Sequence, residues 1–169
     1  MIRLEYVRLA LLGVFFLLLQ LAWYLAFPGW RSGVDIYLVF LLLVSSARGP
    51  LFGGTYALAG GLIMDAVSGP LPVFHLLYYM IPVLIGAQLR SHMLLKFRFL
   101  GAGVLALLLA GKIAAQLITG VIAGWLPSVW YIFHANYLSL ALCVAVVYVL
   151  WPWLIGLIPP GEDRKRVVY

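Results

Sequence analysis

Asp65 is the residue whose type and surroundings most directly suggest chemistry. It lies in the stretch GGLIMDAVSGP, residues 60–70, where every other residue is apolar, glycine, serine or proline. An ionisable side chain is costly to place in an apolar helix, so it marks a functional or structural site. Asp65 could serve as a catalytic acid, a transport site or a fixture that holds helices together.

The residues around Asp65 do not complete a catalytic set. His75 and His134 are expected at the same end of the helices as Asp65, and Ser68 is the nearest nucleophile. The chain lacks the motifs G-x-S-x-G and H-E-x-x-H, and its five acidic residues are too few for a two-metal site. Because serine and histidine at helix ends usually satisfy backbone groups, we predict no catalytic residue, no metal, no cofactor and no enzymatic activity.

The composition predicts an integral membrane protein. Of the 169 residues, 66% are hydrophobic and 9% are charged, whereas a soluble domain is roughly half apolar and a quarter charged. The net charge of +6 does not indicate a nucleic-acid partner, because Lys and Arg mark the cytoplasmic loops of membrane proteins. The single cysteine, Cys143, cannot form an internal disulfide.

Apolar runs predict an all-α fold of six transmembrane helices in one membrane domain, residues 1–169. About 20 apolar residues cross the hydrocarbon core of a bilayer, and proline, glycine and charged clusters separate the runs. The predicted spans are 9–27, 34–47, 51–67, 71–89, 99–123 and 135–158. The first run is too long for a signal-peptide core and ends in bulky residues, so we interpret it as a retained span.

The basic residues predict the orientation of these spans. Six spans place nine of the eleven Lys and Arg residues on one side of the membrane. These nine are Arg3, Arg8, Arg48, Arg90, Lys96, Arg98, Arg164, Lys165 and Arg166, while Arg31 lies on the other side and Lys112 lies within a span. Since basic loops stay in the cytoplasm, both termini are expected there.

In two of the spans, small residues recur at every fourth position, so each set lies on one face of its own helix. Such residues let membrane helices approach closely. They are Gly53, Ala57 and Gly61 in span 51–67, and Ala102, Ala106, Ala110 and Ala114 in span 99–123. We predict both stripes to be tight helix contacts, and the sequence leaves open whether they face this chain or a partner.

Span 99–123 also carries a polar face with Lys112 and Gln116 four residues apart. A lysine near the bilayer centre should point into the bundle or a wet cavity. Asp65 is expected at a similar depth, so our hypothesis is that Asp65 and Lys112 form a buried pair. Asp35 is the rival partner, and Asp65 could instead cap the turn at 68–70.

Three segments of the chain resemble the rod shape-determining protein MreD family. Residues 35–71 carry an Asp at the start of the second span, an Arg-Gly-Pro turn and the pattern G-x-x-x-D-x-x-S-G. The matching residues are Asp35, Arg48, Gly49, Pro50, Gly61, Asp65, Ser68 and Gly69. LPVFHLLYYMIPVLIGAQLR resembles the next helix, and VLWPWLIGLI, with Trp151, Pro152 and Trp153, resembles the end of the last span. Pro72 departs from the family, which often has glycine there.

The resemblance implies a non-enzymatic scaffold in the bacterial inner membrane. Members of the MreD family bind MreC directly and act with MreB, RodA and a penicillin-binding transpeptidase in cell elongation, where they help regulate peptidoglycan synthesis and cell shape. Membrane lipid is also an expected partner, nucleic acid is not, and a homodimer within a larger complex is allowed. Spans 51–67 and 99–123 are the expected contact surfaces, with Asp65 and Arg48 setting helix ends.

The family's six-helix body is also similar to the substrate-binding subunits of energy-coupling-factor transporters. This similarity gives the alternative function, a subunit that binds or transports a small molecule or lipid. Such a subunit needs a polar pocket, and Asp65, His75, His134, Asn136 and Lys112 could line it.

Overall fold

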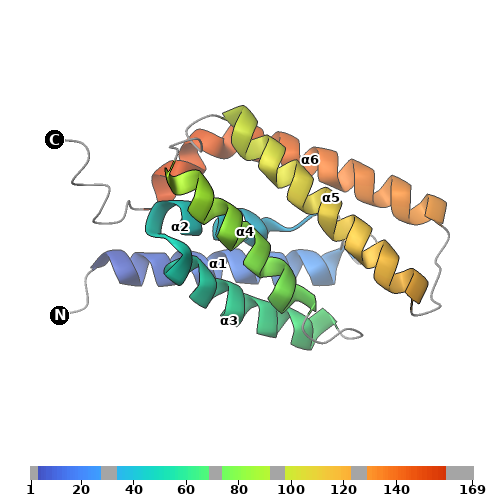
Figure 1. The fold of residues 1–169 in the computed structure, drawn as a ribbon, viewed down its shortest axis with the longest axis horizontal. Coiled ribbons are helices and arrows are strands. Elements are labelled where there is room, and N and C mark those ends of the chain that lie inside the picture. The colour runs from blue at the N-terminus through green and yellow to red at the C-terminus, as the bar shows by residue number, and fades with distance from the viewer. Residues whose placement is uncertain (1–3, 28–33, 69–73, 92–97, 123–128, 159–169) are drawn as a thin grey trace.

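The computed structural model describes residues 4–27, 34–68, 74–91, 98–122 and 129–158, and its elements in these ranges are α-helices (Figure 1). They are α1 (Leu4–Ala26), α2 (Ile36–Arg48), α3 (Pro50–Ser68), α4 (Phe74–Ser91), α5 (Arg98–Ile122) and α6 (Val129–Leu157). For the described residues, the prediction of six helices in an all-α fold is confirmed. Among these helices, α1 alone is long and apolar enough to cross a membrane by its length and composition.

The helices extend beyond some of the apolar runs that predicted them. Helix α1 begins at Leu4 instead of residue 9, and α6 begins at Val129 instead of residue 135. Hydropathy identifies only the apolar part of a helix. The helical hydrogen bonds of the backbone can continue through polar residues on either side, so the helices are longer than the apolar runs. The acidic Glu5 in the first turn of α1 also complements the positive end of the helix dipole.

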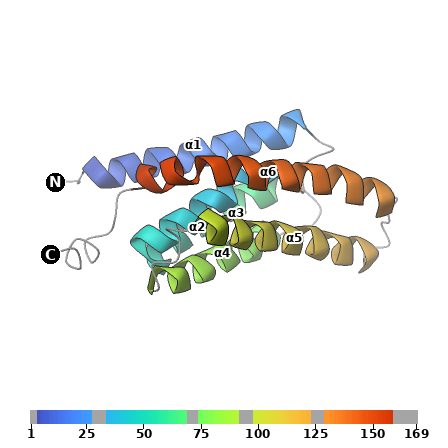
Figure 2. The same ribbon diagram turned by 90° about the horizontal axis from the view of Figure 1, so that it is seen from above.

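Helix α2 forms the centre of the molecule (Figure 2). Its residues are buried except Ile36 and Ala47, which are partly exposed. A helix that is apolar on all sides belongs in a core, and α2 packs against α1, α3 and α4. Its 13 residues make a helix of about 20 Å, so α2 is shorter than the roughly 30 Å hydrocarbon core that a full span crosses.

Consecutive helices run in alternating directions along the long axis of the molecule (Figure 1). As a result, the start of α1, the turn between α2 and α3, and the end of α6 lie near one end of the molecule. The basic residues Arg8 and Arg48 belong to this end. The arrangement agrees with the up-and-down order that the six predicted spans require.

The turn between α2 and α3 follows from the sequence Arg48-Gly49-Pro50. Gly49 has a φ of +98°, a conformation that side chains other than glycine rarely adopt. Its N–H donates to the carbonyl of Ser45 at 2.9 Å, which caps the end of α2. Pro50 starts α3, where its missing N–H is not needed. The helix ends as the Arg-Gly-Pro motif predicts.

The small-residue stripe of α3 faces other helices of the chain. A Cβ added to Gly53 would lie 2.7 Å from Ser45 Cβ of α2, and one added to Gly61 would lie 2.6 Å from Leu76 Cα of α4. Ala57, between them, is completely buried. Close contact among α2, α3 and α4 therefore depends on these small residues, and the stripe is an internal contact.

The small-residue stripe of α5 is buried at one end and exposed at the other. Ala102 is buried and Ala106 is partly buried, but Ala110 and Ala114 are exposed. Within this chain, the second half of the stripe is therefore not a helix contact, and a contact with a partner there stays a prediction. Helix α5 contacts α6 through another residue, Gly101, which lies against the indole ring of Trp151.

Candidate functional site

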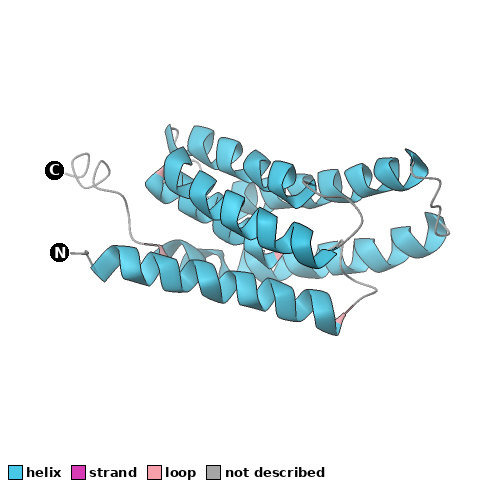
Figure 3. Cartoon of the chain, turned by 90° about the horizontal axis from the view of Figure 1, so that it is seen from below, coloured by secondary structure: helices cyan, strands magenta, loops and turns pink. Residues whose placement is uncertain are grey.

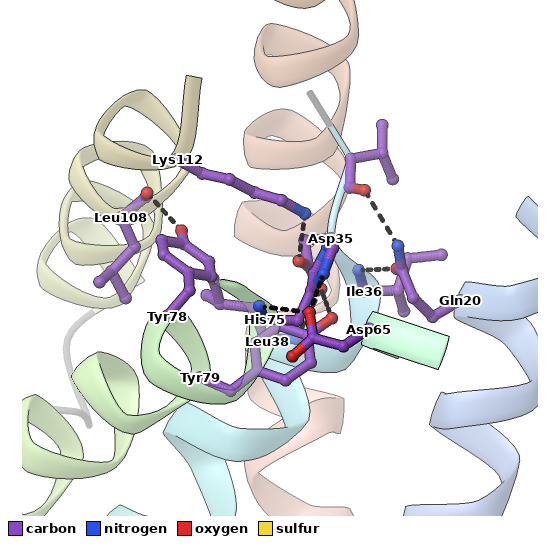
Figure 4. A network of polar contacts seen from close by, with 11 residues as sticks. Gln20, Asp35, Ile36, Leu38, Asp65, His75, Tyr78, Tyr79, Leu108 and Lys112 are labelled. Carbon is purple, nitrogen blue, oxygen red and sulfur yellow. Dashed lines mark hydrogen bonds and ion pairs between the residues drawn. The ribbon is translucent and has the colours of Figure 1, made fainter. Parts of the chain in front are cut away.

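Asp35 occupies the centre of a polar site at the start of α2. Its Oδ1 accepts the N–H of Leu38 at 3.1 Å, so Asp35 is the N-cap of α2. The same oxygen accepts the hydroxyl of Tyr79 at 3.2 Å, and Oδ2 lies 2.5 Å from Lys112 Nζ (Figure 4). The carboxylate is completely buried, and all three contacts place a donor against it.

Lys112 comes from the middle of α5 and is only 1% exposed. Its ammonium group bonds Asp35 and lies 5.8 Å from the centre of the Tyr78 ring, within cation–π range. The Tyr78 hydroxyl in turn donates to the carbonyl of Leu108, one turn before Lys112, at 2.5 Å. These contacts hold α5 to α2 and α4, and they neutralise a charge that would be costly to bury alone.

The hypothesis that Asp65 pairs with Lys112 is wrong. Asp65 instead accepts the backbone N–H groups of His75 at 2.7 Å and of Leu76 at 3.1 Å, and its Oδ1 lies 3.0 Å from His75 Nδ1. The rival partner Asp35 binds Lys112. Similar depth did not make Asp65 and Lys112 neighbours, because Asp65 of α3 binds the start of α4, whereas Lys112 of α5 reaches the start of α2 (Figure 4).

Asp65 therefore caps the start of α4, and residues 69 and 70 of the turn that it could also cap lie outside the described residues. It supplies two acceptors for the first turn of α4, where backbone N–H groups have no partner within the helix. His75 Nδ1 donates to the same carboxylate, which fixes the ring between α3 and α4. Gly61, one turn before Asp65, lets α3 approach closely enough for these bonds.

The two carboxylates are connected through α4. His75 and Tyr79 are one turn apart, and their rings make an edge contact with centroids 5.8 Å apart. The path runs from Asp65 through His75 and Tyr79 to Asp35 and Lys112. These five residues are called the buried polar cluster below, and they come from α3, α4, the N-cap of α2 and α5 (Figure 4).

Gln20 adds α1 to this arrangement. Its side chain is completely buried, with Nε2 donating to the carbonyl of Val34 at 3.3 Å and Oε1 accepting the N–H of Ile36 at 2.7 Å. Gln20 thus binds the backbone on both sides of Asp35. Sequence reasoning missed it, although it is the one amide or charged side chain in the apolar run 9–27. Tyr79 was also missed, and no sequence pattern singled it out.

One pair within the cluster has the arrangement of a base and its orienting acid. His75 Nδ1 lies 3.0 Å from Asp65 Oδ1, and both carboxylate oxygens also bind backbone amides of α4. Within the part of the chain that the structure describes, no group of three His, Cys, Asp or Glu residues could hold a metal. What the contacts do is join the ends of α2 and α4 to α1, α3 and α5.

The remaining predicted residues fall in three places. Arg48 is buried at the opposite end of α2, where its guanidinium bonds Glu5 of α1 at 2.9 Å. Trp151 is buried, whereas Pro152 and Trp153 are exposed within α6. Gly69 and the side chains of Ser68, Gln116, His134 and Asn136 lie outside the described residues.

No protein-family model, curated protein or solved structure matches this chain. The resemblance to the MreD family rests on the sequence motifs alone. The structure adds that Asp65, in the G-x-x-x-D-x-x-S-G pattern, is a helix cap, and that Arg48, in the Arg-Gly-Pro turn, is part of an ion pair.

Proposed function

We propose that this chain is a multi-pass protein of the bacterial inner membrane with both termini in the cytoplasm. The observation that carries this proposal is an inside-out distribution of polarity. Asp35 and Lys112 are buried, while large apolar side chains are exposed on every helix except α2. Examples are Leu11 (66% exposed), Leu62 (61%), Leu84 (64%), Leu107 (71%) and Val149 (66%). Such a surface suits lipid, and an exposed apolar surface this widespread would cause a protein to associate in water.

Within that membrane, we propose a non-enzymatic scaffold of the cell-elongation complex that binds MreC and helps regulate peptidoglycan synthesis and cell shape. The MreD-like motifs support it, and so does the use of the charged residues. Lys112 binds Asp35, Arg48 binds Glu5, and Asp65 binds His75. MreB, RodA and a penicillin-binding transpeptidase would belong to the wider complex.

The exposed part of α5 is the surface that we propose for a partner helix. Ala110 and Ala114 are exposed, and a Cβ added to Gly103 or Gly111 would meet no atom within 4 Å. Small residues on a lipid-facing helix allow another helix to approach its backbone closely. The stripe of α3, by contrast, is already covered by α2 and α4.

The same contacts weigh against the alternative of a small-molecule subunit. Of the five residues that could line a ligand pocket, Asp65 and His75 bind each other and Lys112 binds Asp35. A ligand that used these groups would have to break internal ion pairs. The scaffold function needs no such change.

Co-purification tests the proposed function. The tagged full-length chain is expressed with MreC, extracted from membranes in mild detergent and isolated through the tag. We expect it in the membrane fraction with MreC bound, and an unrelated single-span protein serves as the control. Extraction of the chain alone, with a small molecule retained and MreC absent, would overturn the scaffold proposal.

A further inference from the structure

One face of α1 forms a groove that contains one basic side chain, Arg8. The groove has a volume of about 350 Å³ and is lined, among the described residues, by Leu4, Val7, Arg8, Leu11, Leu12 and Phe15. These positions recur every three or four residues, so they belong to one side of the helix. Figure 3 shows α1 along an edge of the molecule. Its opposite side, with Leu9, Gly13 and Phe16, is buried.

Arg8 differs from the other basic side chains that the structure describes. Lys112 and Arg48 each bind a carboxylate, at 2.5 and 2.9 Å. Arg8 is exposed and has no carboxylate partner among the described residues. Guanidinium binds phosphate well because its planar donors match two phosphate oxygens. Side chains of a helix tilt toward its N-terminus, which directs Arg8 toward the Leu4 end of the groove.

The groove also has the length of one lipid leaflet. Residues 4–15 of a helix extend about 17 Å at 1.5 Å per residue, and half of the hydrocarbon core is about 15 Å. Under the proposed orientation, the Leu4 end is at the cytoplasmic headgroups. A phosphate near Arg8 would therefore place an acyl chain along Leu11 and Phe15.

We propose that this groove binds one anionic phospholipid of the cytoplasmic leaflet, with its phosphate on Arg8 and an acyl chain along Leu11 and Phe15. The proposal rests on the membrane placement described above and not on the binding of MreC. The lipid would cover the exposed side of α1.

The test measures lipid retention by native mass spectrometry. Full-length protein is incubated in detergent with equal amounts of phosphatidylglycerol and phosphatidylethanolamine, and the lipid bound per chain is counted. We expect one retained lipid with a preference for phosphatidylglycerol. Arg8→Gln should lower the affinity for phosphatidylglycerol roughly fivefold, the effect of one basic residue near a membrane surface, whereas Arg8→Lys should retain part of it.

A matched pair of variants tests the apolar part of the groove. Leu11→Trp fills the groove and should lower retention of both lipids, while Leu18→Trp, two turns further along α1 and similarly exposed, should leave retention unchanged. Equal retention by wild type, Arg8→Gln and Leu11→Trp would overturn the proposal. So would a protein dimer that Leu11→Trp dissociates, because a second copy would then occupy the groove.

Failure of the lipid proposal can be distinguished from failure of the proposed scaffold function. MreC binding is measured on the same preparations, and Arg8→Gln should still co-purify with MreC. Loss of MreC binding with normal lipid retention would reject the scaffold alone. Normal MreC binding without a preference for phosphatidylglycerol would reject the lipid site alone.

Discussion

Replacing Lys112 with methionine should destabilise the protein more than any change at an exposed position. Methionine matches the four-atom apolar stem of lysine but lacks the ammonium group, so Asp35 is left as an uncompensated buried carboxylate. Breaking a buried pair in this way costs about 3–5 kcal/mol. At about 2–4 °C per kcal/mol for a chain of this size, the midpoint of thermal unfolding should fall by roughly 6–20 °C.

Asp35→Ala should cost still more, because Asp35 has three donors. It leaves Lys112 buried without a counter-charge, removes the N-cap of α2 and leaves the Tyr79 hydroxyl without its acceptor. Loss of the cap adds about 1 kcal/mol, and the unpaired hydroxyl adds about 1–3 kcal/mol. The total, about 5 kcal/mol or more, is large enough to lower the yield of folded protein.

A double-mutant cycle measures the pair itself. Asp35→Asn keeps an acceptor for the cap, so the double variant Asp35→Asn with Lys112→Met should recover part of the single losses, with a coupling of about 0.5–3 kcal/mol. Asp65→Asn with Lys112→Met should show additive losses. Thermal unfolding in detergent, followed by size-exclusion chromatography with fluorescence detection, provides the measurement. Coupling between Asp65 and Lys112, together with additivity between Asp35 and Lys112, would show that Asp65 and not Asp35 is the partner of Lys112.

Three further changes probe other parts of the fold by the same assay. Gly61→Ala should destabilise the protein by about 1–3 kcal/mol, since the new methyl group meets the α4 backbone. The control Gly54→Ala meets nothing within 4 Å and should leave the stability unchanged. Equal losses of stability in the two variants would contradict the packing of α3 on α4. Asp65→Ala should destabilise the protein by about 1–2 kcal/mol through the lost cap of α4. Hydrogen–deuterium exchange of the first α4 amides should become faster. Unchanged exchange rates would exclude the cap. Arg48→Gln should cost about 1 kcal/mol, because its partner Glu5 is partly exposed, and 1 M salt should reduce the difference; a salt-independent loss would point to packing instead.

The sequence predicted much of the fold because the signals for helices are local. Apolar runs, the Arg48-Gly49-Pro50 turn and small residues every fourth position each reflect the conformation or packing of one helix. The α3 stripe is a packing surface, as predicted, and α5 is only partly one, because the sequence does not show which helix lies opposite. The direction in which each helix face points is fixed only when the helices have assembled.

The same limit explains the site. Asp35, Asp65 and Lys112 were identified as residues that need partners, since an isolated buried charge is unfavourable whatever the fold. The pairing of Asp65 with Lys112 was predicted from their similar depth in the membrane, and several residues can share one depth. Tyr79, which bonds Asp35, was singled out by no sequence pattern. Gln20, which bonds the backbone beside Asp35, did carry a signal as the lone amide of its apolar run.

Photo-crosslinking in intact membranes tests whether α5 contacts the membrane segment of MreC, as the proposed scaffold function requires. A photoreactive amino acid is placed at Leu107 on the exposed side of α5, where the side chain is 71% exposed, and at the completely buried Leu105 as a control. We expect a product of this chain with the membrane segment of MreC from position 107 and none from position 105. Crosslinks from position 107 to lipid alone, in cells that contain MreC, would contradict it.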